Sequence, residues 1–473
     1  MTKRNNSIMK NKLLTALFAC LLVNQATNAQ VTNYFSVKQT VDYGIKNAVQ
    51  VKNALLDIKI QAQTNREITA MALPQINGSV TSTHFFNVAV QTLPNFISPS
   101  TYQVLIDQGV KDGNGNPITF PVGGFGNINA QFGVPWTASA GFDLNQILFD
   151  GQVFVGLQAR SAAMDLARKT ADVTTEQIKA NIYKVYWQLV VGKSQLGSID
   201  ANIERFKKLL HETSEIYKNG FAEKLDVDKV TVQLNNLKTE KIKITQQLSS
   251  GNAGLKFLIN MPQKEELALS DTLDEAVLKS GILDDAYNYQ DKKEIQLLNT
   301  AIELNGFNVK RYKLSRIPTI AAFGIYTKNA QRLKFDFLQK GDWFTNSYAG
   351  IKMTVPIFDG FARRSKIENA KLELEKSKNT LEQTKASMDY DVISAKTKLK
   401  TAILTIDNQK QNTSLAEEVF VVTEKKYQQG LGSNQEIYNA QTELKVAQNN
   451  YYAALYDGIV AKIDYLKAIG KLP

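Results

Sequence analysis

The stretch VPIFDGFARRSK, from Val355 to Lys366, changes from strand-like to helix-like patterning at its centre. Up to this point, the residues of NSYAGIKMTVPIF alternate between apolar and polar, as they do in a half-buried strand. Beyond it, no proline occurs before the terminal Pro473, and proline is strongly disfavoured inside helices. The same change occurs earlier, in QILFDGQVFVGLQAR from Gln146 to Arg160. The sequence therefore predicts two strands that each lead through an FDG turn into a long helix.

Glycine spacing predicts the lengths of these two helices. Gly151 and Gly220 lie 69 residues apart, Gly360 and Gly430 lie 70 residues apart, and both intervals lack proline. At ~1.5 Å per residue, each helix would run about 105 Å. A globular domain of this size does not need helices of that length.

Each FDG turn is predicted to join a strand to its helix. The aspartate can accept hydrogen bonds from the first unpaired helical N–H groups, and the glycine tolerates the backbone angles that a sharp turn demands. The residues of the two turns are Phe149, Asp150, Gly151, Phe358, Asp359 and Gly360.

Two shared offsets indicate an internal duplication. The FDG turns lie 209 residues apart. The segments YKNGFAEKLDVDKVTVQL, from Tyr217, and YQQGLGSNQEIYNAQTEL, from Tyr427, are offset by 210 residues. One spacing shared by two unrelated signatures favours two structural repeats. Each half is expected to contain a helix, two strands, a long helix, a tight turn and a returning helix.

The predicted boundaries follow from these signals. The first repeat covers 30–262, with strands at about 74–88 and 133–148, a long helix at about 151–219 and a returning helix at about 222–260. The second repeat covers 263–473, with strands at about 317–329 and 346–358, a long helix at about 360–429 and a returning helix at about 433–470.

Residues 1–29 have the pattern of a secretory signal peptide. Basic residues precede an apolar run from Leu13 to Val23, and ATNAQ offers a small-residue cleavage site after Ala29. Cys20, the only cysteine, lies in this run, so a lipoprotein interpretation stays open, although Phe18 is bulky where a small residue is expected. Cleavage after Ala29 leaves no cysteine, which excludes disulfides and thiolate metal sites.

The strands have the dimensions of membrane strands. No later stretch approaches the roughly 20 apolar residues of a transmembrane helix, which leaves a soluble exported protein or a β-barrel. Trp136 and Phe149 lie 13 residues apart. At ~3.3 Å per residue and a tilt near 45°, this is about 30 Å of height, the thickness of a hydrocarbon core. Trp343 and Phe358 give a similar span, although aromatic strand ends also occur in soluble sandwiches.

Four strands cannot close a barrel. An open sheet edge in lipid leaves backbone groups unpaired at several kcal/mol each, so the chain is expected to oligomerise. Three copies would give 12 strands, an even number within the known range, and counting alone also admits six copies. The expected fold is mainly α with membrane β: an α-barrel of long helices plus a shared 12-stranded β-barrel, with four strands per protomer.

Over essentially all of its mature length, the chain resembles the TolC family of outer-membrane efflux proteins. The matching features are LPQI at Leu73, RIPTI at Arg316, IYKVYWQLV at Ile182, both FDG turns and both Y-x-x-G tips. The resemblance implies a homotrimer in the cell outer membrane with a long periplasmic extension. It also implies a porin-like duct that conducts substrates passively from a periplasmic adaptor, the membrane fusion protein, and an inner-membrane pump.

The resemblance also assigns candidate site residues. The hairpin tips, which meet the adaptor in the family, correspond to Gly220, Phe221, Ala222, Gly430, Leu431 and Gly432. The glycines equally fit ordinary helix C-caps, and both roles are compatible. A periplasmic constriction with lumen-facing acids is expected near Glu424, although Val421 occupies the next inward turn, where the family carries a second acid. Further candidates for this constriction are Glu417, Glu418, Glu212 and Glu215, although a solvated outer helix face would carry the same charges.

Other function classes fit less well. The two histidines, His84 and His211, have no metal or nucleophile partner at motif spacing, so neither catalysis nor a cofactor or metal is expected. An exported chain makes nucleic acid an unexpected partner. A periplasmic adaptor or a trimeric coiled-coil protein is the main alternative, but one helical hairpin or sustained heptads would be expected there. The cargo, whether drug, metal, dye or polypeptide, is not encoded in these patterns.

Overall fold

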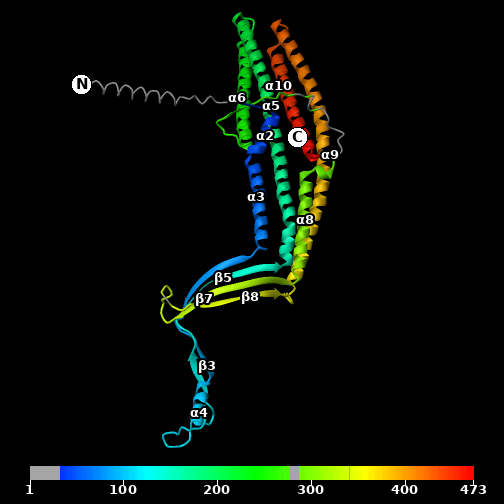
Figure 1. Ribbon diagram of the computed structural model, residues 1–473. Coiled ribbons are helices and arrows are strands. Elements are labelled where there is room, and N and C mark those ends of the chain that lie inside the picture. Colours follow the sequence, from blue (N-terminus) through cyan, green and yellow to red (C-terminus); the bar gives the residue numbers. More distant parts are fainter. Residues whose placement is uncertain (1–31, 274, 276–277, 279–286, 340) are drawn as a thin grey trace, which may run out of the picture. The chain divides into compact units, whose positions relative to one another are not determined.

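The computed structural model describes residues 32–273, 275, 278, 287–339 and 341–473 (Figure 1). The predicted signal peptide and Cys20 lie outside the described residues. The described chain divides into two compact units, and each unit takes segments from both halves of the sequence. Unit 1 contains the described residues up to 62 together with 161–305 and 373–473, and unit 2 contains 63–160 and 306–372. The compact units therefore do not coincide with the two predicted repeats.

The helices account for most of the described chain. The first half contains α2 (Val37–Asn47), α3 (Val49–Ala70), α4 (Ile97–Asp107), α5 (Gly151–Lys218) and α6 (Lys224–Leu258). The second half contains the short 3-10 helix η1 (Tyr289–Asp291), α8 (Lys293–Leu314), α9 (Ala362–Gln428) and α10 (Asn434–Ala468). None of the described helices is both long and apolar enough to cross a membrane.

The strands of the described residues form three separate sheets. The four-stranded antiparallel sheet has the order β2-β5-β7-β8 and consists of β2 (Gln75–His84), β5 (Trp136–Phe149), β7 (Thr319–Arg332) and β8 (Phe344–Thr354). A parallel pair joins β1 (Thr32–Phe35) to β6 (Glu266–Leu269), and an antiparallel pair joins β3 (Val90–Pro94) to β4 (Asn127–Gln131). The central pairing, β5 with β7, connects the two halves of the sequence.

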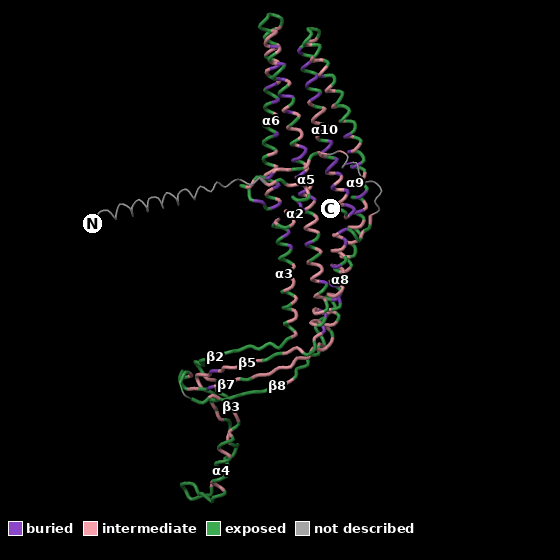
Figure 2. The backbone as a smooth tube through the Cα atoms, turned by 45° about the horizontal axis from the view of Figure 1, so that its top comes forward, coloured by how far each residue is buried: buried purple, intermediate pink, exposed green. Residues whose placement is uncertain are grey.

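Unit 1 is held together by apolar clusters between its helices. One cluster joins α2, α5 and α6 and contains Val41, Ile182, Tyr186 and Leu255. Another joins α9 and α10 through Leu399 and further apolar residues. Figure 2 shows buried residues spaced along these helices, as expected for amphipathic helices that pack on one side.

Tyr186, from the segment IYKVYWQLV, connects α5 to the parallel strand pair. Its side chain is fully buried, and its hydroxyl donates to the Phe35 carbonyl at 2.9 Å and accepts from the Asp271 N–H at 3.3 Å. Burial raises the pKa of Tyr186 to about 12, so the hydroxyl stays protonated at neutral pH.

The sheet of unit 2 has one apolar and one polar face. In register across the strands, Val80, Ala140 and Lys328 share one face, as do Gly78, Phe142 and Tyr326. Asn77, Asp143 and Ile325 lie on the opposite face. The edge strands β2 and β8 are almost entirely exposed (Figure 2).

The insertion between β2 and β5 contains β3, α4 and β4. Its KDGNGNP segment forms a turn in which the Asp112 carboxylate accepts from the N–H groups of Asn114 and Asn116, both at 2.9 Å. These bonds hold the pKa of Asp112 below its usual value.

Replacing Tyr186 with phenylalanine should destabilise unit 1 by about 1–2 kcal/mol, because the partly buried Asp271 N–H loses its acceptor and the Phe35 carbonyl loses its donor. Tyr183→Phe is the matched control, since its hydroxyl makes only a 3.4 Å bond near the surface. Chemical denaturation of the purified chain, followed by circular dichroism, measures both effects.

The same hydroxyl links stability to pH. The pKa of the Tyr186 hydroxyl rises from 10.0 to about 12 on folding. Its contribution to the free energy of unfolding is therefore fully present below pH 10 and is lost as the pH rises toward 12. The Tyr186→Phe variant should therefore lose less stability than the wild type between pH 10 and pH 12. Equal alkaline profiles in both proteins would contradict the assignment.

Candidate functional site: the hairpin tips and the FDG turns

Each hairpin tip is closed by the same backbone motif. In the first tip, the Gly220 N–H donates to the Tyr217 carbonyl at 2.9 Å and the Phe221 N–H donates to the Ile216 carbonyl at 3.0 Å. In the second tip, the Gly430 and Leu431 N–H groups bond the Tyr427 and Lys426 carbonyls at 3.0 and 2.9 Å. These are Schellman motifs, in which a residue with positive φ ends the helix.

The two glycines have the conformation that this motif requires. Gly220 has φ +80° and Gly430 has φ +75°. No neighbouring heavy atom lies within 4 Å of where a Cβ would be at either position, so the backbone angle rather than crowding explains the glycine. The helix C-cap role that the sequence predicts is therefore present at both tips.

The motif also exposes one apolar side chain at each tip. Phe221 is 86% exposed and Leu431 is 77% exposed, whereas Ala222 and Gly432 are half-buried. The returning helices then begin with caps: Glu223 and Asp226 form a capping box before α6, and the Ser433 side chain accepts from the Glu436 N–H before α10. Each tip thus presents an apolar residue on a firmly capped turn.

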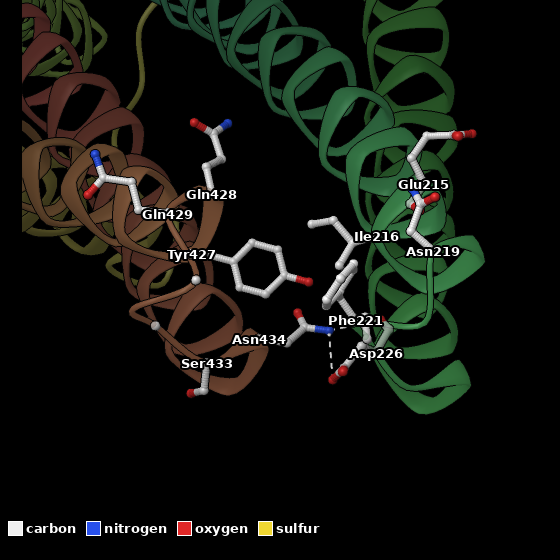
Figure 3. Close-up of a pocket in the computed structure, with 13 residues that line it drawn as sticks. Glu215, Ile216, Asn219, Phe221, Asp226, Tyr427, Gln428, Gln429, Ser433 and Asn434 are labelled. Carbon is white, nitrogen blue, oxygen red and sulfur yellow. Dashed lines mark hydrogen bonds between the residues drawn. The ribbon is translucent and has the colours of Figure 1, made fainter.

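The two tips line a shared pocket of about 750 Å³ (Figure 3). Tyr427 and Asn434 point from the second hairpin toward Ile216, Phe221 and Asp226 of the first. The Asn434 amide donates to the Asp226 backbone carbonyl at 2.8 Å and to its carboxylate at 3.4 Å. The Asn434 residue is 7% exposed, so this contact is largely shielded from water.

A second set of polar contacts joins the hairpins beside this pocket. The Tyr427 hydroxyl donates to the Thr213 hydroxyl at 3.3 Å, and the Gln428 amide donates to Glu212 at 2.9 Å. Farther from the tips, the Arg205 guanidinium pairs with Glu417 and also lies 5.9 Å from the centre of the Phe420 ring. Apolar residues of all four helices, including Phe206, complete the core beneath.

Three of the five candidate acids contact other side chains. Glu212 and Glu417 contact the other hairpin, and Glu215 pairs with Lys218 on its own helix at 2.8 Å. The hydrogen bond from Lys218 and its positive charge hold the pKa of Glu215 below its usual value. Glu418 and Glu424 make no ion pair with any residue that the structure describes.

The two FDG turns use their aspartates in the same way and their glycines differently. Asp150 accepts from the Gln152 and Val153 N–H groups at 2.7 and 3.2 Å, and Asp359 accepts from the Arg363 N–H at 3.0 Å. Gly360 has φ +63°, the left-handed conformation that the sequence analysis expects. Gly151 is instead the first residue of α5, outside the left-handed region.

Close packing explains Gly151. A Cβ at this position would lie 2.8 Å from the Leu314 Cβ and 2.9 Å from the Ile317 Cδ1, closer than side chains pack. Backbone freedom is therefore the wrong explanation for this glycine and the right one for Gly360. Phe149 and Phe358 precede the aspartates and are 37% and 76% exposed.

Of the residues that connect the hairpins, Glu212 and Glu417 are sequence-based candidates, whereas their partners and the Asn434–Asp226 pair are not. Arg205, Thr213, Asp226 and Asn434 belong to ordinary helical segments, and their partners lie roughly 200 residues away in sequence. No local motif marks such contacts. The histidines play no part in them: His84 stacks on Trp136 with ring centres 4.2 Å apart, and His211 is exposed.

The comparisons with known proteins concern both halves of the chain. Residues 311–471, which include β7, β8, α9 and α10, match the family model described as "Outer membrane efflux protein". The predicted family resemblance is confirmed. The outer membrane efflux proteins are transport proteins, not a family of enzymes. Among the described residues, no group of three or more His, Cys, Asp or Glu side chains could hold a metal ion.

The solved structures of CusC, the outer membrane protein VceC and the CmeC outer membrane channel share the fold of nearly the whole chain. CusC is 15% identical, with 93% of each chain covered and a TM-score of 0.71. VceC from Vibrio cholerae is 13% identical, covering 92% of this chain and 96% of its own, with a TM-score of 0.66. The Campylobacter jejuni CmeC outer membrane channel is 15% identical, covering 92% and 85%, with a TM-score of 0.68. A search of curated proteins finds no match.

Replacing Asn434 with alanine should loosen the contact between the tips, because Asp226 loses a largely buried donor. Backbone amides at 219–223 should then exchange hydrogen about fivefold faster, equivalent to about 1 kcal/mol. Gln435→Ala is the control, since its amide bonds only Asn439 on the same helix. Unchanged exchange in Asn434→Ala would show that this bond does not hold the tips together.

The two FDG glycines should respond oppositely to asparagine, which tolerates the left-handed conformation. Gly360→Asn should be nearly neutral, whereas Gly151→Asn should cost about 1–3 kcal/mol because its Cβ overlaps Leu314. Chemical denaturation of the purified variants compares them directly. Equal destabilisation at the two positions would refute the distinction.

Proposed function

We propose that this chain is one protomer of a homotrimeric outer-membrane channel. The channel conducts substrates passively from a periplasmic adaptor and an inner-membrane pump to the cell exterior. The family match and the shared fold support the role of an efflux channel. The assembly and its partners are inferred from the features of the sheet and the tips.

The open sheet of unit 2 is the observation that carries this proposal. In the described chain, β2 pairs only with β5, and β8 pairs only with β7, so each has one free edge. These edge strands are 10 and 11 residues long, about the length of membrane strands. In lipid, every free N–H and C=O group on such an edge would cost several kcal/mol.

Copies of the same chain supply the missing partners. If β8 of one protomer pairs with β2 of the next, three protomers close a barrel of 12 strands and leave no edge. The apolar face, which exposes Val80, Phe142 and Ile351, would then contact lipid. The opposite face, with Asn77 and Asp143, would line the water-filled interior.

The long helices would form the periplasmic α-barrel. Helix α9 carries a series of apolar side chains that are more than half exposed in the described chain, including Leu372, Tyr390, Ile393, Leu404 and Leu415. Isolated exposed apolar residues are common, but a series along one helix favours packing against another subunit. This series is consistent with helices that pack side by side around a duct.

The exposed tips are the proposed adaptor contact. Phe221 and Leu431 occupy equivalent positions on two identically capped turns, and each exposes an apolar side chain. A few well-packed residues typically carry most of the energy of a protein interface, and we assign that role to these two exposed side chains. Glu418 and Glu424 are the proposed lumen-facing acids of the constriction, because the described chain leaves them without an ion pair. Threefold repetition would concentrate their negative potential and favour cations.

Complementation of a deletion strain tests the proposal. The wild-type gene should restore resistance across a compound panel, and the Phe221→Asp/Leu431→Asp variant should not, because charged tips weaken the adaptor contact. A double variant of this kind should lower adaptor co-purification at least about tenfold, since each buried anchor is worth more than about 1 kcal/mol. Both proteins should migrate as heat-modifiable trimers.

Leu338→Asp is the matched control. Leu338 is 94% exposed in the connection between β7 and β8, distant in sequence from both tips. Its replacement should leave resistance and adaptor binding unchanged. Wild-type protein that never forms a trimer, or deletion without any change in sensitivity or secretion, would contradict the proposed function.

A further inference from the structure

The apolar face of the sheet carries a groove over β2, β5 and β7. The groove has a volume of about 520 Å³, within the roughly 300–1,000 Å³ typical of small-molecule sites. Its lining includes Gly78 and Ala140, whose small side chains leave a depression, and the larger Phe142, Tyr326 and Trp343 around them. The lining is predominantly apolar, and Lys328 is its one charged residue among the described residues.

Lys328 is the unusual residue of this face. It lies in the same cross-strand row as Val80, Ala140 and Thr345. Its side chain is exposed, and no described residue pairs with its amine. The other cation on this face of β7, Arg332, is different because Asp336 lies 3.4 Å from its guanidinium and the Asp342 carbonyl accepts from it.

An unpaired lysine on a lipid-facing strand is unfavourable unless its charge reaches water or an anion. Lys328 lies four residues along β7 from Arg332, which pairs in register with Trp136. Trp136 belongs to a chain of contacting rings that includes His84, Phe335, Phe337 and Trp343, as in the aromatic belt at a membrane interface. A lysine side chain extended toward this belt can place its amine among lipid phosphates.

We propose that the groove binds a phosphorylated glycolipid of the outer leaflet, with an acyl chain over Gly78 and Ala140 and a phosphate on the Lys328 amine. This inference rests on the proposed function, which places the apolar face in lipid. The groove lies over β2, β5 and β7 on one face of the sheet. Pairing of β2 with β8 of a neighbouring copy would occur in the plane of the sheet, so closing the barrel leaves this face open. A phosphate supplies the negative partner that the unpaired Lys328 ammonium lacks.

The position of Lys328 along β7 indicates which leaflet of the membrane supplies the lipid. β7 begins at Thr319, five residues after the end of α8, and ends at Arg332. If the helices extend into the periplasm, Lys328 lies in the outward half of the strand. A phosphate monoester on a sugar carries up to two negative charges, compared with one on a phosphodiester lipid. The site should therefore prefer the glycolipid.

Native mass spectrometry of the detergent-purified full-length trimer tests the proposal, with diphosphoryl lipid A as the probe. The wild type should bind up to one lipid per protomer, and Lys328→Gln should lower its apparent affinity about tenfold, the loss expected for one charge-assisted contact. Ala140→Phe, which fills the groove without changing charge, should lower it similarly. Lys352→Gln is the matched control, because Lys352 is exposed on the opposite face of the same sheet.

Two comparison lipids and a chemical probe complete the test. Phosphatidylcholine and phosphatidylglycerol should bind more weakly than lipid A, and equal binding of phosphatidylglycerol would overturn the assignment to the glycolipid. On the wild-type trimer, lipid A should slow acetylation of Lys328 and leave that of Lys352 unchanged, a readout that needs no variant. Absence of protection, or loss of binding in Lys352→Gln equal to that in Lys328→Gln, would overturn the site. A wild type that forms no trimer would instead count against the proposed function.

Discussion

The free edges of one four-stranded sheet impose the strongest constraint on this molecule. Backbone N–H and C=O groups must be paired wherever water is absent, and β2 and β8 each leave a full row unpaired. One face of the sheet is also apolar and exposed, which is unfavourable in water over so many residues. A closed barrel made of several copies satisfies both requirements at once, and the proposed trimer follows from that physical need.

Corresponding segments in the two halves of the chain form the same turns but make different packing contacts. Both tips end in Schellman motifs around Gly220 and Gly430, so the turn itself is the same. The contacts between the tips are not symmetrical, since Asn434 of the second hairpin bonds Asp226 of the first. The FDG turns diverge as well, with left-handed Gly360 in one and closely packed Gly151 in the other. Similar local sequence therefore produces similar caps but different packing.

Most elements could be predicted because their signals are local. The long helices at α5 and α9 follow from proline-free intervals, and the tip glycines follow from the requirement for positive φ at a helix end. The Asp150 and Asp359 caps follow from their position before a helix. The candidate acids were less predictable, because exposed carboxylates look alike in sequence: Glu417 pairs with Arg205, whereas Glu424 has no ion pair in the described chain.

The long helices, the four strands of the main sheet and the turns between them could be read from local signals, since periodicity, proline and glycine act on neighbouring residues. Which of these elements meet is set by the folded chain. It joins the two halves through β5 and β7, places Asn434 against Asp226, and leaves Lys328 unpaired beside an apolar groove. These choices depend on register and packing between segments some 200 residues apart, where a shift of one residue reverses the face of a strand. The local sequence pattern of one strand does not specify its register with a distant strand.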